Sequence, residues 1–98
     1  MIIKELFEQL ETSNHPVAKP LRKGEHFKVV AIGFKKGMVL KEHKTALPAK
    51  LIVLAGSVLY KEGGISKTLH QYDETEIPEH VLHAVECIED ALCMLIQG

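Results

Sequence analysis

The sequence has no marked excess of charge of either sign and no long hydrophobic run. Its 12 basic and 13 acidic residues give a formal net charge of −1, whereas a general nucleic-acid-binding protein carries a basic excess. No segment approaches the roughly 18 apolar residues that a membrane-spanning helix needs. The first residues, MIIKELFEQLET, carry charges too early and too often for a secretory signal peptide. These absences predict a cytoplasmic protein that binds neither nucleic acid nor membrane.

Cysteine is also scarce, with only Cys87 and Cys93 in the chain. Their spacing differs from the C-x-x-C pattern, which argues against a redox motif or a zinc knuckle. In a reducing cytoplasm both side chains would remain thiols. We predict that both pack as small apolar residues of a strand.

The chain contains no linker and no low-complexity segment, so its 98 residues are predicted to form a single domain. Near the N-terminus, apolar residues recur at helical spacing at Ile3, Leu6, Phe7 and Leu10. They predict one short helix within residues 1–14, ended by the segment TSN and Pro16. Because so short a helix is marginal alone, we expect it to pack on the outside or at the mouth of a body formed by residues 17–97.

After Pro16 the pattern changes to short runs that are rich in β-branched and aromatic residues. The predicted strands are 27–34, 39–40, 51–60, 66–71, 74–77, 81–88 and 91–96. Gly63-Gly64 predicts a hairpin between two of them, and Glu89-Asp90 predicts the last turn. Many short strands with glycine and proline between them, and no second helix, predict an all-β barrel or sandwich.

One predicted strand, LIVLAGSVL at 51–59, is apolar at both odd and even positions. A strand with one face in water alternates between apolar and polar residues. Both faces of this strand are therefore predicted to be covered, one by the core and the other by a partner subunit or by the N-terminal helix. A homodimer that pairs sheets is the preferred interpretation, and a fully buried strand within a monomer is the alternative.

Two histidines occur in glycine- and proline-containing patterns that resemble the motifs of the cupin superfamily. Gly37 is followed by five residues and then His43, and Gly56 lies thirteen positions after His43. Pro78 is followed by four residues and then His83. The resemblance covers roughly residues 27–96 and implies a small double-stranded β-helix, or jelly-roll, barrel with one short N-terminal helix. The single cupin domain would span residues 1–98.

The chain departs from the cupin motifs at several positions. The family holds a divalent metal such as iron, manganese, nickel or zinc with three histidines and one glutamate. Here Thr45 stands at the second histidine position, and Ala49, or Lys50 if the loop slips by one residue, stands at the glutamate position. Two glycine positions of the second motif hold Tyr72 and His80, and its asparagine position holds Cys87.

These departures leave His43 and His83 as the implied metal ligands. His80 would be a third ligand if residues 78–80 bend inward, because residues 80 and 83 of a straight strand face opposite sides. Two histidines bind a metal weakly, since three or four protein ligands normally set its geometry. The resemblance is therefore compatible both with a barrel that holds a metal ion and with a barrel that holds none.

Three functions follow from this interpretation. In the first, the barrel binds a small polar or anionic molecule in a pocket lined by His43, Thr45, Lys50 and His83, where Lys50 would favour an anion. In the second, the protein is a metal-dependent enzyme of the oxygenase or isomerase type, with His43, His83 and His80 at the metal. In the third, it is a structural or regulatory module that acts through its dimer surface. No catalytic residue is assigned, and the sequence does not decide whether the protein is an enzyme.

Overall fold

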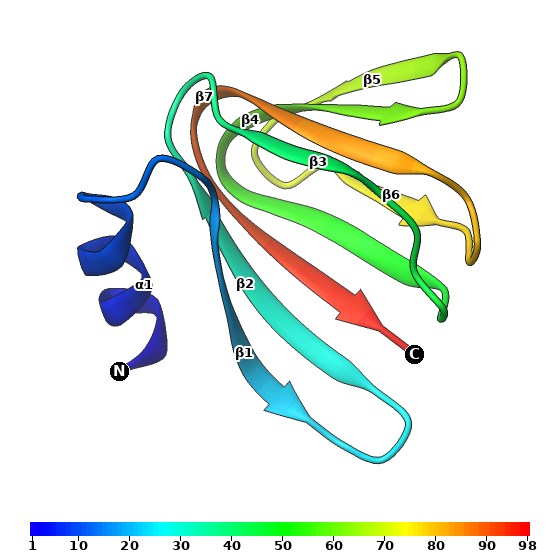
Figure 1. Ribbon diagram of the computed structural model, residues 1–98, viewed down its shortest axis with the longest axis horizontal. Coiled ribbons are helices and arrows are strands. Elements are labelled where there is room, and N and C mark those ends of the chain that lie inside the picture. Colours follow the sequence, from blue (N-terminus) through cyan, green and yellow to red (C-terminus); the bar gives the residue numbers. More distant parts are fainter.

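The computed structural model describes residues 1–98, which form one helix and seven strands (Figure 1). In chain order these are α1 (Ile2–Leu10), β1 (Val17–Lys23), β2 (Lys28–Phe34), β3 (Val39–His43), β4 (Ala49–Glu62), β5 (Ile65–Leu69), β6 (Glu74–Ile77) and β7 (His83–Gln97). The helix, nine residues long, falls short of the length that would cross a membrane.

The two long strands β4 and β7 connect two facing layers (Figure 1). They pair antiparallel along almost their whole length, from Ala49 opposite Gln97 to Glu62 opposite His83. One layer has the order β1-β2-β7-β4-β6, and the other has the order β3-β7-β4-β5. All of these pairs are antiparallel, which confirms the predicted all-β jelly-roll with one short helix.

Both long strands bend where they pass from one layer to the other. The pairing of β4 with β7 shifts register between Val53 and Val58, and Gly56 has φ +78°. A Cβ atom on Gly56 would overlap the carbonyl oxygen of Asp90 on β7. The prediction of a turn at Glu89-Asp90 is wrong: Ser57 stays paired with Glu89, and the two strands predicted there are one bent strand that begins at His83.

Strand β1 was not among the predicted strands. It contains Pro20 and three basic residues, which weaken its strand pattern. It pairs only with β2, so it is an edge strand of its layer. Proline and basic side chains are typical of edge strands, because they prevent further strands from pairing there.

The core lies between the two layers. It consists of 14 buried residues, of which Phe34, Leu51, Tyr60 and Ile77 have the largest fully buried side chains. Cys87 and Cys93 belong to it as buried free thiols, as predicted. The face of each strand that points into the core follows from the alternation of buried and exposed residues.

Helix α1 packs on the outside of the barrel against β1 and β2. Its buried residues are Leu6 and Leu10, and Leu6 lies so close to Gly33 of β2 that a Cβ there would overlap it. The helix therefore does not account for the second apolar face of the run at 51–59. The outward side chains of that run, Ile52, Leu54 and Leu59, are half-buried.

Candidate functional site

The structure brings His43 and His83 together on the inner face of the barrel. The two residues lie directly opposite each other on β3 and β7. Their ring centroids are 4.2 Å apart and the ring planes are inclined by 60°. His83 is buried at 3% exposure, whereas His43 is half-buried. Because opposite residues of an antiparallel pair share one face of the sheet, the register of β3 on β7 fixes this contact.

Backbone carbonyl groups determine the proton positions of both imidazole rings. Nδ1 of His43 lies 2.7 Å from the carbonyl oxygen of Lys41, and Nδ1 of His83 lies 3.1 Å from that of Val81. A carbonyl oxygen only accepts hydrogen bonds, so each Nδ1 carries the proton and donates it. In the neutral rings, Nε2 is then a hydrogen-bond acceptor.

Neither Nε2 atom has a hydrogen-bond partner within the protein. No buried side-chain nitrogen or oxygen lacks a partner, so the small exposed area of His83 includes Nε2. The pair therefore presents two neighbouring acceptors without a partner within the protein. Two such acceptors can receive hydrogen bonds from hydroxyl or amino groups.

Tyr60 and Glu62 complete the polar group around His83, although neither was among the site residues predicted from the sequence. The Tyr60 ring stacks on His83 with centroids 6.1 Å apart, and its hydroxyl donates a 2.8 Å hydrogen bond to Oε1 of Glu62. Glu62 lies opposite His83 on β4. His43, His83 and Glu62 thus form one row across three adjacent strands. The two-residue spacing of Tyr60 and Glu62 was the available signal, because it places both on one face of a strand.

The surroundings favour the uncharged forms of His83 and Tyr60. Burial lowers the pKa of His83, and nearby His43 lowers it further, against the opposing effects of the Val81 carbonyl group and Glu62. Burial is also the main cause that raises the pKa of Tyr60, followed by the hydrogen bond to Glu62. The result is a neutral imidazole beside a protonated phenol.

Thr45 lies beside His43 in a surface hollow of about 320 Å³. The hollow is lined by His43, Lys44, Thr45, Ala46, Leu47 and Gln97. Thr45 is buried, and its hydroxyl donates a 2.7 Å hydrogen bond to the carbonyl oxygen of Leu47. The hydroxyl oxygen keeps its capacity to accept a hydrogen bond. The predicted grouping of His43 with Thr45 therefore has a geometric basis.

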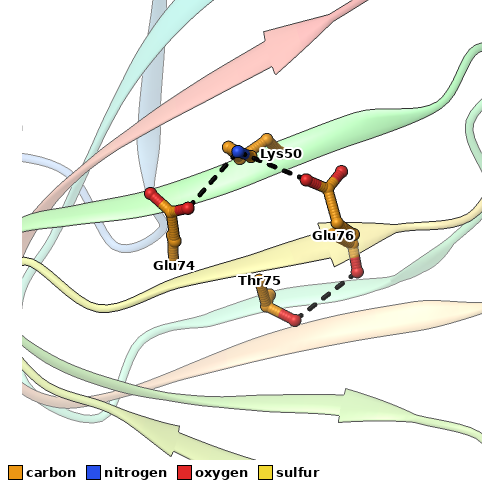
Figure 2. A network of polar contacts seen from close by, with 4 residues as sticks. All are labelled: Lys50, Glu74, Thr75 and Glu76. Atoms are coloured by element: carbon orange, nitrogen blue, oxygen red, sulfur yellow. Dashed lines mark hydrogen bonds and ion pairs between the residues drawn. The ribbon is translucent and has the colours of Figure 1, made fainter.

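Lys50 does not lie with the histidines, in contrast to the predicted pocket. Its neighbours Ala49 and Leu51 point into the core, so Lys50 points outward from β4. There its Nζ lies 3.3 Å from carboxylate oxygens of both Glu74 and Glu76 on β6, as Figure 2 shows. The hydrogen bonds with Glu74 and Glu76 raise the pKa of Lys50.

His80 lies in the predicted bend but does not complete a metal site. Glu79 and His80 form a turn, and the His80 N–H donates a 2.8 Å bond to the Thr45 carbonyl oxygen. The His80 residue is exposed, and no group of three or more His, Cys, Asp or Glu residues could hold a metal ion. The two available imidazoles are fewer than the three or four protein ligands of most transition-metal sites, so the chain alone does not supply a complete metal site.

The two glycine positions of the second motif keep the backbone shape of glycine. Tyr72 has φ +71° and His80 has φ +62°, and they are the two non-glycine residues with positive φ. In the first motif Gly37 and Gly56 have φ of +86° and +78°. Bent backbone at four motif positions, an antiparallel jelly-roll and an inward histidine pair define a barrel protein of the double-stranded β-helix class.

Comparison with solved structures agrees with this assignment. A cupin superfamily protein from Desulfitobacterium hafniense has a TM-score of 0.81 at 16% identity, covering 87% of this chain and 78% of that one. A cupin 2 conserved barrel domain protein from Leptotrichia buccalis has a TM-score of 0.81 at 26% identity, covering 88% and 42%. A candidate mannose-6-phosphate isomerase from Ralstonia eutropha has a TM-score of 0.78 at 16% identity, covering 88% and 86%.

No protein-family model matches the sequence, and no curated protein matches it. The structural likeness, at low sequence identity, shows the fold: the chain has the cupin fold, as the resemblance of its motifs implied.

Proposed function

We propose that the protein binds a small polar molecule that donates hydrogen bonds to Nε2 of His43 and Nε2 of His83. One observation carries the proposal: both Nδ1 atoms donate to backbone carbonyl groups, which leaves two adjacent acceptors without a protein partner. Unpartnered polar atoms at the inner edge of a barrel favour a ligand or water as their partner.

The proposed ligand is neutral and carries two or more hydroxyl or amino groups. The hollow of about 320 Å³ beside His43 and Thr45 lies within the size range of small-molecule sites. An anionic ligand loses its main support, because the ammonium group of Lys50 is occupied by Glu74 and Glu76 on the outer face. Lys44, which also lines the hollow, is exposed.

The test is a titration followed by nitrogen-15 NMR of the histidine side chains. The probes are glycerol, xylitol and glucose as neutral polyols, and glycerate and gluconate as their anionic counterparts. We expect a polyol to shift the Nε2 resonances of His43 and His83. The shift should be absent in His43→Phe, which keeps a ring but removes the acceptor, and retained in His70→Gln, which changes an exposed histidine outside the site.

Selective shifts with the carboxylates would contradict the neutral ligand class. The absence of any response to all five probes, or a response that survives His43→Phe, would contradict binding at the histidine pair. The resting spectrum provides a further check, since protonated Nε2 atoms in the free protein at pH 7.5 would remove the basis of the proposal.

A metal-dependent enzyme is the second candidate, because the same Nε2 atoms are in the form that metals require. It would need ligands in addition to the two imidazoles. Elemental analysis of the purified protein distinguishes the two candidates. About one equivalent of zinc, iron, manganese or nickel, lost in His43→Phe, would favour the metal-dependent enzyme over the proposed binding protein.

A further inference from the structure

The charged residues of the chain are unevenly distributed, although its net charge is close to zero. Residues 16–44, which contain β1, β2 and β3, hold eight of the 12 basic residues and only two of the 13 acidic residues. None of these eight lysine and arginine side chains forms an ion pair within the protein. This part of the surface therefore carries an uncompensated positive charge, which attracts acidic partners.

A mainly apolar hollow of about 510 Å³ lies between the start of β1 and β3. β1 is an edge strand of one layer, and β3 is an edge strand of the other (Figure 1). On one side the hollow is lined by His15 and Pro16, which precede β1, and on the other by Val39–His43, the whole of β3. Because five consecutive residues line it, the hollow runs along the edge of β3 and not across one face of the sheet.

The edge of β3 that faces away from β7 has unused backbone hydrogen-bonding groups. β3 pairs only with β7, and no backbone-to-backbone hydrogen bond outside this pairing involves residues 39–44. The carbonyl group of Lys41 is engaged by Nδ1 of His43. The other outward N–H and C=O groups of this edge are available to an extended chain that aligns with the strand.

The side chains along this edge specify the kind of chain that it accepts. Val39 is 47% exposed and, with Pro16 across the hollow, offers an apolar contact to one side chain of a partner. Lys41 and Lys44 are exposed, and Glu42 is the only acidic residue among residues 39–44. Lysines on an edge strand disfavour most strand additions, but opposite charges on neighbouring strands stabilise their pairing. An acidic extended segment is therefore the partner that this edge admits.

Single-stranded nucleic acid is another polyanion that a basic surface attracts. Proteins that bind it stack the bases on aromatic side chains. The hollow has no phenylalanine, tyrosine or tryptophan among its lining residues, and its apolar contacts come from valine, leucine and proline. These contacts suit an aliphatic side chain, so the observations favour a peptide segment over a nucleic acid.

We propose that the edge of β3 binds an acidic, extended segment of a partner protein, which aligns beside β3 and places one aliphatic side chain in the hollow against Val39 and Pro16. Lys41 and Lys44 pair with carboxylates on the two sides of that side chain. The segment makes no use of the Nε2 atoms of the histidine pair, so the proposal is independent of the ligand that the pair binds.

The chemistry of the partner is tested with a capped, fluorescein-labelled heptapeptide in which one leucine lies between two runs of three glutamates. Fluorescence anisotropy at low salt should give a dissociation constant on the order of 100 μM, because a few exposed charge pairs and one apolar contact support weak binding. Replacing the leucine by serine should weaken binding about tenfold, and replacing the glutamates by lysines should abolish it. No binding of the glutamate–leucine peptide, or equal binding of the serine peptide, overturns the proposal.

The position of the site is tested with two double variants of equal net charge. Lys41→Gln with Lys44→Gln should weaken binding of the glutamate–leucine peptide about fivefold. Lys4→Gln with Lys67→Gln removes the same charge from α1 and β5 and should weaken binding by less than about twofold. Circular dichroism verifies that both variants are folded. Equal weakening in the two variants would show attraction by the overall charge alone and would overturn the site.

Backbone amide NMR locates the bound peptide directly. We expect its titration to shift the amides of residues 39–44 and to leave those of β5 unchanged, since β5 is the opposite edge strand of the same layer. Shifts confined to any other element overturn the proposal. The same shifts on concentrating the protein alone would assign the edge to a second copy, and tighter binding of a thymidine heptanucleotide at these amides would assign it to nucleic acid. Either result overturns the proposed partner.

Discussion

The bend of β4 at Gly56 provides a quantitative test of the fold, because the chain contains a matched glycine without the crowding. Gly56 and Gly37 have similar positive φ angles, +78° and +86°. A Cβ on Gly56 would overlap the carbonyl oxygen of Asp90, whereas a Cβ on Gly37 would meet nothing within 4 Å. The Gly56→Ala and Gly37→Ala variants therefore share the backbone strain and differ in the contact.

The expected free energies of unfolding follow from these two contributions. Alanine in the left-handed region costs roughly 1–2 kcal/mol at either position. Forcing a methyl group into a packed site costs roughly 1–3 kcal/mol more, and at Gly56 the obstacle is backbone, which can move only if β4 and β7 separate. The lower entropy of the unfolded alanine chain offsets part of the loss equally in both variants. Gly56→Ala should therefore be less stable than Gly37→Ala by about 1–3 kcal/mol.

Equilibrium unfolding in urea measures this difference. The chain has no tryptophan, so far-UV circular dichroism is the suitable signal. The dependence of the free energy of unfolding on urea concentration should have the same slope in the wild type and both variants. Their midpoints can then be compared directly. Equal stability losses in the two variants, or a larger loss for Gly37→Ala, would refute the close approach of Gly56 to Asp90.

Three further predictions concern single side chains. Tyr72 is 75% exposed and has φ +71°, a left-handed backbone that glycine adopts without strain. Tyr72→Gly should therefore raise the free energy of unfolding, measured in urea, by about 1 kcal/mol. An unchanged urea midpoint would show that this backbone is unstrained. Burial lowers the pKa of His83, so below about pH 6.5 the unfolded chain binds more protons than the folded protein, and the free energy of unfolding should decrease as the pH is lowered. Urea unfolding between pH 7.5 and 5 should show a smaller decrease for His83→Gln than for the wild type. Burial raises the pKa of Cys87 to about 11 and of Cys93 to about 12, so at pH 8 a thiol reagent should label them only as the barrel opens, and labelling as fast as in urea would contradict their burial.

The histidine pair could be predicted because it depends on spacing within two motifs. Gly37 lies in the turn before β3 and Pro78 lies between β6 and β7, and the register of β3 on β7 brings the two rings together. The same motifs have glycine at the positions of Tyr72 and His80, and in the structure both residues have positive φ. Short-range patterns of this kind are visible in one sequence, because turns and strand ends are local.

Lys50 and Glu62 could not be placed in the same way. The loop before β4 left the register uncertain by one residue, and a slip of one residue moves a side chain to the opposite face of the sheet. Glu62 lies beside His83 only through the pairing of β4 with β7, which joins residues far apart in the chain. Strand β1 was missed because Pro20 and its basic neighbours suit an edge strand but weaken the pattern by which a strand is predicted.

The central position of β7 affects how the chain can fold as it is synthesised. β7 pairs with β2, β3 and β4, so it joins both layers, yet it is the last of the eight elements to leave the ribosome. Until then the nascent chain exposes the apolar faces of β2 and β4 without their common neighbour, although hairpins such as β1–β2 and β4–β5 can already form. Pairing between residues as distant as Lys28 and Gln97 makes folding slow, and during that interval the unpaired strands are exposed to aggregation.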